Sequence, residues 1–382
     1  MAINTIKINI KSMGAEMNRR EFLKTTSFML AGAAAGFNGA DIMAKEHKYS
    51  MPLRVLGKDF KVSALGLGCM GMSANHGPAR DKKEMINLIA EAYDLGINFF
   101  DTAEIYGPHI NEELVGSALK RYRKQVAIGT KFGLYYPNGK QLEDARPESI
   151  RKALEGSLKR LQTDYVDIYY QHRIDNKVPI EDVAGTMKDL VKEGKILHWG
   201  MSEPNIETIK RAHKEFPVTA VENQYAMSFR RHEEQTFKVI EELGIGLVAY
   251  SPLDRGYLAG QMDGNTKFDK KLDMRAGFPR MSHENMTKNR VIIDFLKELG
   301  NEKGGATPAQ IALAWILAQK PWIVPIPETT NISHLRENIK AVNITWTKKE
   351  MEEINKRLSK IKLYGERYQP ESDAAKSVYN LI

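Results

Sequence analysis

The stretch "PESIRKALEGSLKRLQTDYVDIYYQH", residues 147–172, decides the fold that we predict for this chain. Its first half places apolar residues at three- and four-residue steps, which is the period of an amphipathic helix. Its second half, residues 165–172, is a short apolar and aromatic run that ends in His172, as is typical of a buried strand. A strand that is apolar on both faces needs a covering layer on each side, so the stretch predicts a parallel sheet covered by helices.

The same alternation continues in both directions along the chain. Eight strand-like runs are separated by longer amphipathic runs, and the eight are residues 64–68, 97–101, 126–132, 165–172, 196–202, 219–225, 245–251 and 322–328. Eight alternations predict an α/β fold of the (β/α)8 barrel type. An open doubly wound sheet is the alternative, but its Gly-x-Gly-x-x-Gly turn should open a helix. The nearest match, "GLGCMG" at 66–71, is followed by a polar loop.

Three further segments surround this repeat. Residues 53–62, "LRVLGKDFKV", predict an N-terminal β-hairpin whose turn is Gly57–Asp59. Residues 254–290, rich in glycine and polar residues, predict a long loop after the seventh strand, and loops of this length are usually functional. We therefore expect residues 45–382 to form a single barrel domain.

The segment "NRREFLKTTSFMLAGAAAGF", residues 18–37, does not fit the barrel pattern. Its apolar part is too short to span a bilayer but suits a signal sequence. With Arg19 and Arg20 in front, it resembles a twin-arginine signal, which implies the twin-arginine export machinery as a partner and a folded, periplasmic product. We expect residues 1–44 to be this leader. The alternative is an amphipathic helix docked on the domain, in a cytoplasmic protein.

The bulk composition excludes several classes of function. The net charge of the 382 residues is +8, but the basic residues are interspersed with acidic ones, and the densest cluster, "KRYRK" at 120–124, is expected to be a solvated helix end. We therefore predict no nucleic-acid partner. Outside the leader no run is apolar for about 18 residues, so we predict no membrane span. The single cysteine, Cys69, cannot form an intramolecular disulfide.

Four polar residues stand where predicted strands run into their following loops. Asp101 and Lys131 lie near the ends of the second and third strands, Tyr106 follows the second, and His172 ends the fourth. Catalytic groups of an α/β barrel lie at this end of the strands. Each residue alone could be structural, but all four on one face indicate an active site.

These residues belong to blocks that resemble the aldo-keto reductase superfamily, in the branch of bacterial aldehyde reductases and potassium-channel β subunits. The resemblance covers about residues 52–345, and its blocks are "DTAEIYG" (101–107), "GTKFG" (129–133), "YYQH" (169–172), "GMSEPN" (200–205) and "AYSPLDRGYLAG" (249–260). It implies an oxidoreductase that interconverts an aldehyde or ketone, possibly a sugar, and its alcohol by hydride transfer to or from NAD(P).

The resemblance assigns a role to each of the four residues. Tyr106 is the general acid in reduction and the base in oxidation. A free tyrosine, with a pKa of about 10, is a poor acid at neutral pH, so the Lys131 ammonium is expected to lower the pKa of Tyr106. Asp101 holds Lys131 through an ion pair, and His172 orients the substrate carbonyl and stabilises charge on its oxygen.

The resemblance also implies a set of cofactor contacts. Tyr250 stacks on the nicotinamide and Ser202 binds its carboxamide, while Glu222 occupies a position where the family commonly has glutamine. The full expected set is Ser202, Glu222, Tyr250, Ser251, Pro252, Leu253, Gly256, Thr329, His334, Glu337 and Asn338. We expect no metal site.

The identity of the cofactor and of the substrate is less determined. NADP(H) is the expected cofactor and NAD(H) the alternative, because Glu328 and Asn331 occupy positions that are often glycine or basic in the family. For substrate specificity we nominate Tyr135, Trp199 and the loop at 254–290. The reaction direction and the oligomeric state are not predicted.

Two other functions remain as alternatives at this point. A barrel lysine such as Lys131 could form a Schiff base in an aldolase, although this leaves Tyr250 and the block at 326–339 without a role. A cofactor-sensing binding subunit is the alternative that is not an enzyme. The leader adds an expectation of its own: an exported enzyme needs a tightly held cofactor that is cycled by paired oxidation and reduction.

Overall fold

A computed structural model describes residues 51–372 and 375–376 of the chain. The chain divides into two units, Met1–His47 and Lys48–Ile382, and the described residues all belong to the second. The predicted leader at 1–44 lies outside the described residues. No helix among the described residues is both long and apolar enough to cross a membrane.

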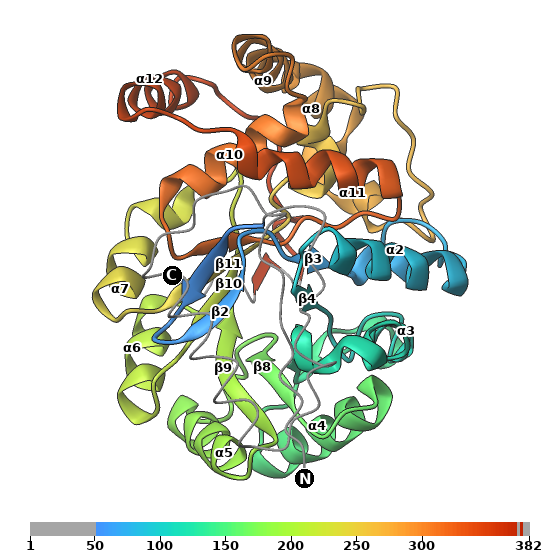
Figure 1. Ribbon diagram of the computed structural model, residues 1–382, viewed down its shortest axis with the longest axis vertical. Helices are drawn as coiled ribbons and strands as arrows, with labels where there is room; N and C mark the ends of the chain where they lie inside the picture. The colour runs from blue at the N-terminus through green and yellow to red at the C-terminus, as the bar shows by residue number, and fades with distance from the viewer. Residues whose placement is uncertain (1–50, 373–374, 377–382) are drawn as a thin grey trace, which may run out of the picture. The chain divides into compact units, whose positions relative to one another are not determined.

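The second unit is built on one parallel sheet of eight strands (Figure 1). Every pair of neighbours is parallel, and the sheet order follows the chain: β3 (Leu67–Gly68), β4 (Phe99–Asp101), β5 (Ala127–Phe132), β8 (Val166–Gln171), β9 (Ile196–Ser202), β10 (Ala220–Gln224), β11 (Gly246–Tyr250) and β12 (Ile323–Pro325).

The sheet closes on itself where its first and last strands meet. The Gly66 N–H donates to the carbonyl of Pro325 at 3.0 Å, and Gly68 forms a parallel bridge with Glu328. The (β/α)8 barrel is therefore confirmed, and each of the eight predicted runs contains its strand.

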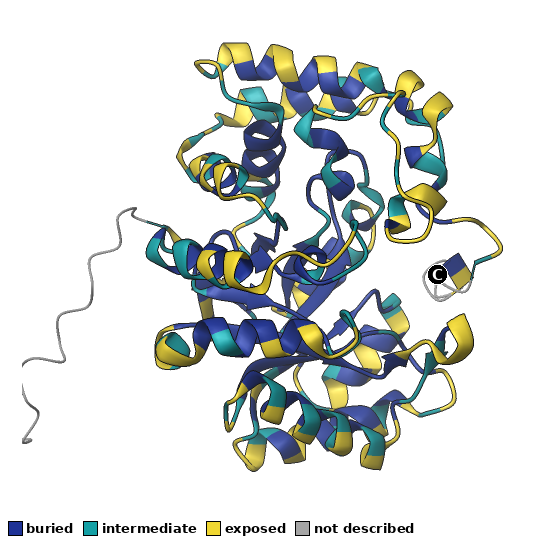
Figure 2. Cartoon of the chain, turned by 90° about the vertical axis from the view of Figure 1, so that its right-hand side faces the viewer, coloured by how far each residue is buried: buried dark blue, intermediate teal, exposed yellow. Residues whose placement is uncertain are grey.

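Helices cover the outside of the barrel, with buried inner faces and exposed outer faces (Figure 2). Local signals fix where they begin: the Asp81 side chain accepts from the Glu84 N–H at 2.9 Å at the start of α2, and Thr307 and Gln310 form a capping box on α10. The helices are α2 (Lys82–Asp94), α3 (Ile110–Leu119), α4 (Pro147–Leu161), α5 (Ile180–Lys192), α6 (Ile206–Glu215), α7 (Thr236–Glu242), α8 (His283–Lys288), α9 (Arg290–Glu302), α10 (Pro308–Gln319), α11 (Ile332–Ile339) and α12 (Lys348–Leu358).

The predicted hairpin forms the floor of the barrel. Its strands β1 (Leu53–Leu56) and β2 (Phe60–Ser63) are antiparallel, and Leu56, Phe60 and Val62 are buried against inward-facing apolar residues of the barrel strands. Gly57 allows the tight turn, because it has a φ of +61° and a Cβ there would lie 2.9 Å from the Thr219 carbonyl oxygen.

Strand alternation then determines what the mouth of the barrel presents. Successive side chains on a strand point to opposite faces. Phe99 on β4 and Ala127 on β5 point into the barrel, where they belong to the apolar cluster above the floor. Asp101 lies two residues after Phe99 and Lys131 four residues after Ala127, so both also point inward, closer to the mouth. Asp101 and Lys131 therefore form a polar layer at the mouth, on the same strands whose apolar side chains pack above the floor.

The loop after β11 contains three short 3-10 helices, with an irregular stretch between the first and the second. These are η5 (Asp254–Ala259), η6 (Met274–Gly277) and η7 (Pro279–Met281), followed by α8. The loop meets the segment after β3, where the Gly77 N–H donates to Leu272 and the Met274 N–H to Asn75, at 3.1 and 2.8 Å. A second small sheet, β6 (Leu134–Tyr135) with β7 (Leu142–Glu143), lies in the loop after β5.

The basic cluster at 120–124 is a helix end, as expected, and its residues Lys120, Arg121 and Lys124 are exposed. It forms the 3-10 helix η2 (Lys120–Gln125), in which Arg123 pairs with Asp167 at 2.7 Å and donates to the Tyr165 carbonyl at 2.8 Å. Arg123 is the exception within the cluster, because these contacts join it to β8 and to the residue before β8.

Candidate active site

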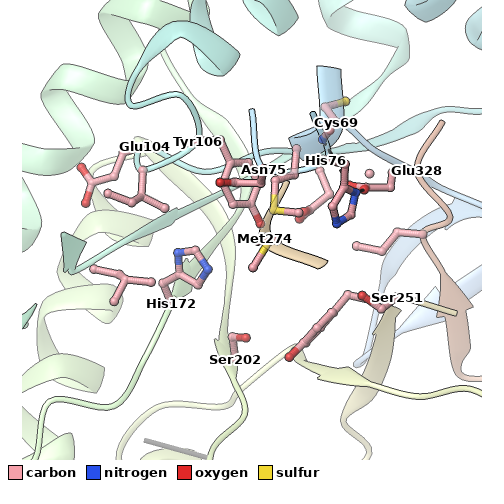
Figure 3. Close-up of a pocket in the computed structure, with 18 of the residues that line it drawn as sticks. Cys69, Asn75, His76, Glu104, Tyr106, His172, Ser202, Ser251, Met274 and Glu328 are labelled. Atoms are coloured by element: carbon pink, nitrogen blue, oxygen red, sulfur yellow. Dashed lines mark hydrogen bonds and ion pairs between the residues drawn. The ribbon is translucent and has the colours of Figure 1, made fainter. Parts of the chain in front are cut away.

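A cavity of about 1650 Å³ opens at the C-terminal ends of the strands (Figure 3). Asp101, Tyr106 and His172 line it, with Lys131 buried beneath them. In Figure 3 His172 lies on one side of Tyr106, and Cys69, His76 and Glu328 lie on the other. Nine of the eleven expected cofactor contacts also line the cavity: Ser202, Glu222, Tyr250, Ser251, Pro252, Leu253, Gly256, Thr329 and His334.

The Lys131 ammonium is at the centre of the buried charges. Its Nζ lies 2.5 Å from Asp101 Oδ1, 2.9 Å from the Thr102 carbonyl oxygen and 3.3 Å from Glu222 Oε1. Burial acts to lower the pKa of Lys131, but the carboxylates of Asp101 and Glu222 outweigh it and raise that pKa. A lysine held as an ammonium by three acceptors is a poor amine nucleophile, which argues against the Schiff-base aldolase.

Tyr106 and His172 lie edge to face, with ring centroids 5.9 Å apart and planes at 83°. The Lys131 Nζ is 5.2 Å from the Tyr106 ring centroid. Burial raises the pKa of Tyr106, and Lys131 opposes this shift without reversing it, so the expected net lowering is not found. Tyr106 is therefore a neutral phenol, the form that can donate a proton.

His172 is also neutral. Burial, and then the charges of Arg173 and Lys131, lower the pKa of His172 well below its usual range. A neutral imidazole carries one N–H that it can donate to an oxygen and adds no charge beside Lys131.

Glu222 brings a second carboxyl to the Lys131 site. Burial, and then the neighbouring Asp101, raise the pKa of Glu222 to about 8. Within the described part of the chain, neither Asp101 Oδ2 nor Glu222 Oε2 has a hydrogen-bond partner.

The turn after β11 has the shape of an anion-binding loop. Ser251, Asp254, Arg255 and Gly256 have φ angles of 46°, 47°, 56° and 94°. Three of the four are not glycine, and such strained conformations concentrate at functional sites. The Asp254 carboxylate is turned away into the protein, where it accepts from Ser228 Oγ at 2.7 Å. The Asp254 and Gly256 N–H groups donate to the Ser251 and Leu253 carbonyls at 2.9 and 3.0 Å, whereas Arg255 lines the cavity and brings a cation that suits a pyrophosphate.

The residues after β12 divide between the cavity and the interior. Thr329 and His334 line the cavity, whereas Glu337 accepts a hydrogen bond from Thr307 Oγ1 at 2.7 Å, and neither Glu337 nor Asn338 lines the cavity. Arg336 is engaged with Glu91 at 2.8 Å on the surface.

Of the nominated specificity residues, Tyr135 lines the cavity and is 41% exposed. The nomination of Trp199 is wrong. Its ring points into the helix layer, stacks on Phe216 and donates to the Pro217 carbonyl at 2.9 Å. The loop at 254–290 contributes Gln261, Met262, Met274 and Arg275 to the cavity wall.

A cluster of arginines and a tyrosine beside the cavity was not predicted from the sequence. Arg367, from the segment after α12, pairs with Glu203 at 2.8 Å and also contacts the Tyr250 hydroxyl. Burial acts to raise the pKa of Tyr368, but the nearby arginines outweigh it and lower that pKa to about 8, and these are Arg367, Arg255 and Arg173. The paired arginine and tyrosine in "GERYQP" (365–370) were the available signal.

A closed parallel barrel with this polar layer at its mouth defines an NAD(P)-dependent oxidoreductase of the barrel type. The chain belongs to the Aldo/keto reductase family, whose model matches residues 64–358.

Known proteins of this family resemble the chain in sequence and in structure. A relative described as "Probable aldo-keto reductase 1" from Glycine max is 42% identical over 308 residues, which are 79% of this chain and 87% of the relative. The solved glycerol dehydrogenase from Gluconobacter oxydans superposes with a TM-score of 0.73 at 28% identity, covering 80% of this chain and 94% of that one. An aldo/keto reductase from Klebsiella pneumoniae, in complex with NADP and acetate, gives a TM-score of 0.64 at 26% identity over 83% and 98% of the two chains.

Proposed function

We propose that this protein interconverts an aldehyde or ketone, such as a sugar, and the corresponding alcohol, with Tyr106 as the proton donor and acceptor. The observation that supports this most is the convergence of Tyr106 and His172 on one cavity directly above the buried ion pair of Lys131 and Asp101. Bound NAD(P) supplies the hydride acceptor or donor.

The chain's own residues prepare the proton transfer. The neutral His172 donates a hydrogen bond to the substrate oxygen and so fixes it beside the Tyr106 hydroxyl. As negative charge develops on that oxygen, the Tyr106 proton moves to it, and the Lys131 ammonium stabilises the phenolate that remains. Asp101 keeps Lys131 in place at 2.5 Å.

NADP(H) is the proposed cofactor, and NAD(H) is the alternative. The proposed NADP(H) is supported by the NADP complex of the Klebsiella pneumoniae neighbour. Glu328 at the cavity wall and the pairing of Arg336 with Glu91 favour the alternative, because a 2′-phosphate needs free cations. Dissociation constants of both dinucleotides for the purified protein distinguish the two.

Replacing Tyr106 by phenylalanine tests the mechanism. Loss of the proton donor should lower kcat/KM for a panel of aldehydes and ketones at least about 100-fold, the usual contribution of general acid catalysis. Tyr170→Phe is the matched control, because the Tyr170 ring centroid also lies 5.9 Å from the Lys131 Nζ but Tyr170 is buried and does not line the cavity. We expect the control to retain activity within about twofold. Equal turnover by Tyr106→Phe and wild type would contradict the mechanism.

We further propose that residues 1–44 direct folded export, with the barrel domain at 45–382 carrying its cofactor to the periplasm. Support comes from the twin-arginine pattern at Arg19 and Arg20. Replacing both arginines by lysine should leave the protein in the cytoplasmic fraction, and nicotinamide that co-purifies from the periplasm would support a tightly held cofactor. Unchanged fractionation of the double variant would contradict export by this route.

A further inference from the structure

Two buried carboxyl groups share one buried ammonium at the mouth of the barrel. Asp101 Oδ1 and Glu222 Oε1 lie 2.5 and 3.3 Å from the Lys131 Nζ, and all three residues are nearly inaccessible to solvent. One ammonium balances only one carboxylate. A second carboxylate buried at the same site would remain uncompensated, which is costly enough that such groups take up a proton instead.

The carboxyl oxygens of Asp101 and Glu222 that have no hydrogen-bond partner indicate where this proton lies. Asp101 Oδ2 and Glu222 Oε2 are buried and lack a donor among the described residues, while the two side chains lie within hydrogen-bond reach of each other. A single proton between the carboxyl groups gives each its missing interaction. Asp101 makes the shorter contact with Lys131, so Asp101 keeps the negative charge and Glu222 holds the proton.

The other groups that face Glu222 do not supply a second cation to balance it. Tyr170 on β8 and Tyr106 after β4 are neutral phenols whose pKa values are raised, first of all by burial. Arg173, after β8, attracts the Glu222 charge, but its effect on the pKa of Glu222 is smaller than those of burial, Asp101 and Lys131. Tyr250 on the neighbouring strand β11 is bound to Glu203. None of these replaces the missing cation.

We propose that Glu222 is a redox-linked proton site: it carries a proton in the free enzyme and in the complex with reduced nicotinamide, and it releases that proton to solvent when oxidised nicotinamide binds. This inference rests on the proposed function. The oxidised nicotinamide ring carries a positive charge and the reduced ring does not. Glu222 lines the cavity beside Ser202 and Tyr250, so the oxidised ring supplies the cation that the site lacks. A glutamine at this position cannot respond in this way.

The consequence is a pH-dependent preference for the oxidised cofactor. Binding of the oxidised form is linked to the loss of one proton, so its dissociation constant falls as the pH rises, while that of the reduced form changes little. Between the pKa values of Glu222 in the two complexes, the ratio of the reduced to the oxidised Kd should rise about tenfold per pH unit, as one-proton linkage requires.

The test measures Kd for NAD⁺, NADH, NADP⁺ and NADPH from about pH 6 to pH 9.5. We expect the ratio to rise with pH in the wild type, to be independent of pH in Glu222→Gln, and to depend on pH again in Glu222→Asp. Glu104→Gln is the matched control: burial raises the pKa of Glu104 to about 7 and it lines the same cavity, but it bonds to the Gly133 N–H and not to Lys131. This control should keep the wild-type pH dependence.

Proton counting by calorimetry in buffers of different ionisation enthalpy provides a second readout on the unmodified protein. At neutral pH we expect release of close to one proton on binding the oxidised form and none on binding the reduced form. Equal proton release for the two forms, or the same pH dependence in Glu222→Gln as in wild type, would overturn the inference. Failure of the wild type to bind any of the four dinucleotides would instead overturn the proposed function.

Discussion

The floor and the mouth of the barrel are built from the same strands but hold opposite kinds of side chain. At the floor, Phe60 and Leu56 of the hairpin pack against apolar residues of the strands, and nothing there needs a counter-ion. At the mouth, Asp101, Lys131 and Glu222 are just as buried but depend on one another for charge balance. The floor therefore contributes stability through burial of apolar surface, whereas the mouth costs stability and provides chemistry.

Removing the cation at the mouth should break this arrangement most severely. Lys131→Met leaves two buried carboxyl groups without their ammonium, so we expect turnover to fall about 1000-fold or more and the free energy of unfolding to fall by about 3 kcal/mol at neutral pH. Urea unfolding and steady-state kinetics measure both. The exposed Lys61→Met on the floor hairpin is the control and should change stability by less than about 0.5 kcal/mol.

Truncating the floor should affect stability without affecting the chemistry. Phe60→Ala removes a large side chain that contacts Phe99 edge to face, and we expect a loss of about 3–5 kcal/mol in the free energy of unfolding. The kcat of the folded variant should stay within about twofold of wild type. A large loss of kcat at temperatures where the variant is folded would show that the two ends are coupled.

Replacing Glu222 by glutamine should change how the stability of the protein depends on pH, and so show what the charges at the mouth cost. The pKa of Glu222 is raised from its ordinary 4.5 to about 8, so the folded protein holds this proton more tightly than the unfolded chain does. Wild type therefore loses stability from this group as the pH rises from about 4.5 to about 8, and the glutamine variant does not. We expect the variant to be more stable than wild type by at least about 1 kcal/mol at pH 8, with the difference vanishing near pH 4. Thermal unfolding of the two proteins across this range measures it.

The smallest expected effect is at Ser202. Its Oγ accepts from Arg173 Nη1 at 3.0 Å, and Arg173 keeps its bond to the His172 carbonyl when Ser202 is replaced by alanine. We expect the Kd for the nicotinamide cofactor to rise about three- to tenfold, with stability lowered by about 1 kcal/mol. An unchanged Kd would place Ser202 outside the cofactor contacts.

Much of the difference between the floor and the mouth of the barrel could be predicted from the sequence. Apolar runs that alternate with amphipathic helices are compatible with only a few topologies. The eight strands, the hairpin and the residues at the strand ends follow from local patterns. Side-chain direction was harder, since an apolar run covered on both faces does not show which residues point inward. Trp199 was misplaced for this reason, although its odd spacing from Ser202 on β9 puts the two on opposite faces.

Charge balance could not be predicted from the sequence either. The sequence shows a glutamate at position 222, where the family commonly has glutamine. Whether Glu222 carries a proton depends on how close its carboxyl group and that of Asp101 lie to the Lys131 ammonium, and only the closed barrel sets these distances. Arg367 lies in a polar segment with no period that would place it, and Glu337 matches the family block yet bonds to Thr307 instead of facing the cavity.

The position of Arg367 also has a consequence for the order of assembly. It follows α12, so every strand and helix of the barrel is synthesised before this side chain reaches Glu203 and the Tyr250 hydroxyl. Although burial acts to raise the pKa of Glu203, Arg367 is the chief charge that lowers it. A chain truncated after α12 would retain a barrel in which Glu203 has lost its chief counter-charge. The segment after α12 thus completes the charge balance beside Tyr250 only after the barrel strands are in place.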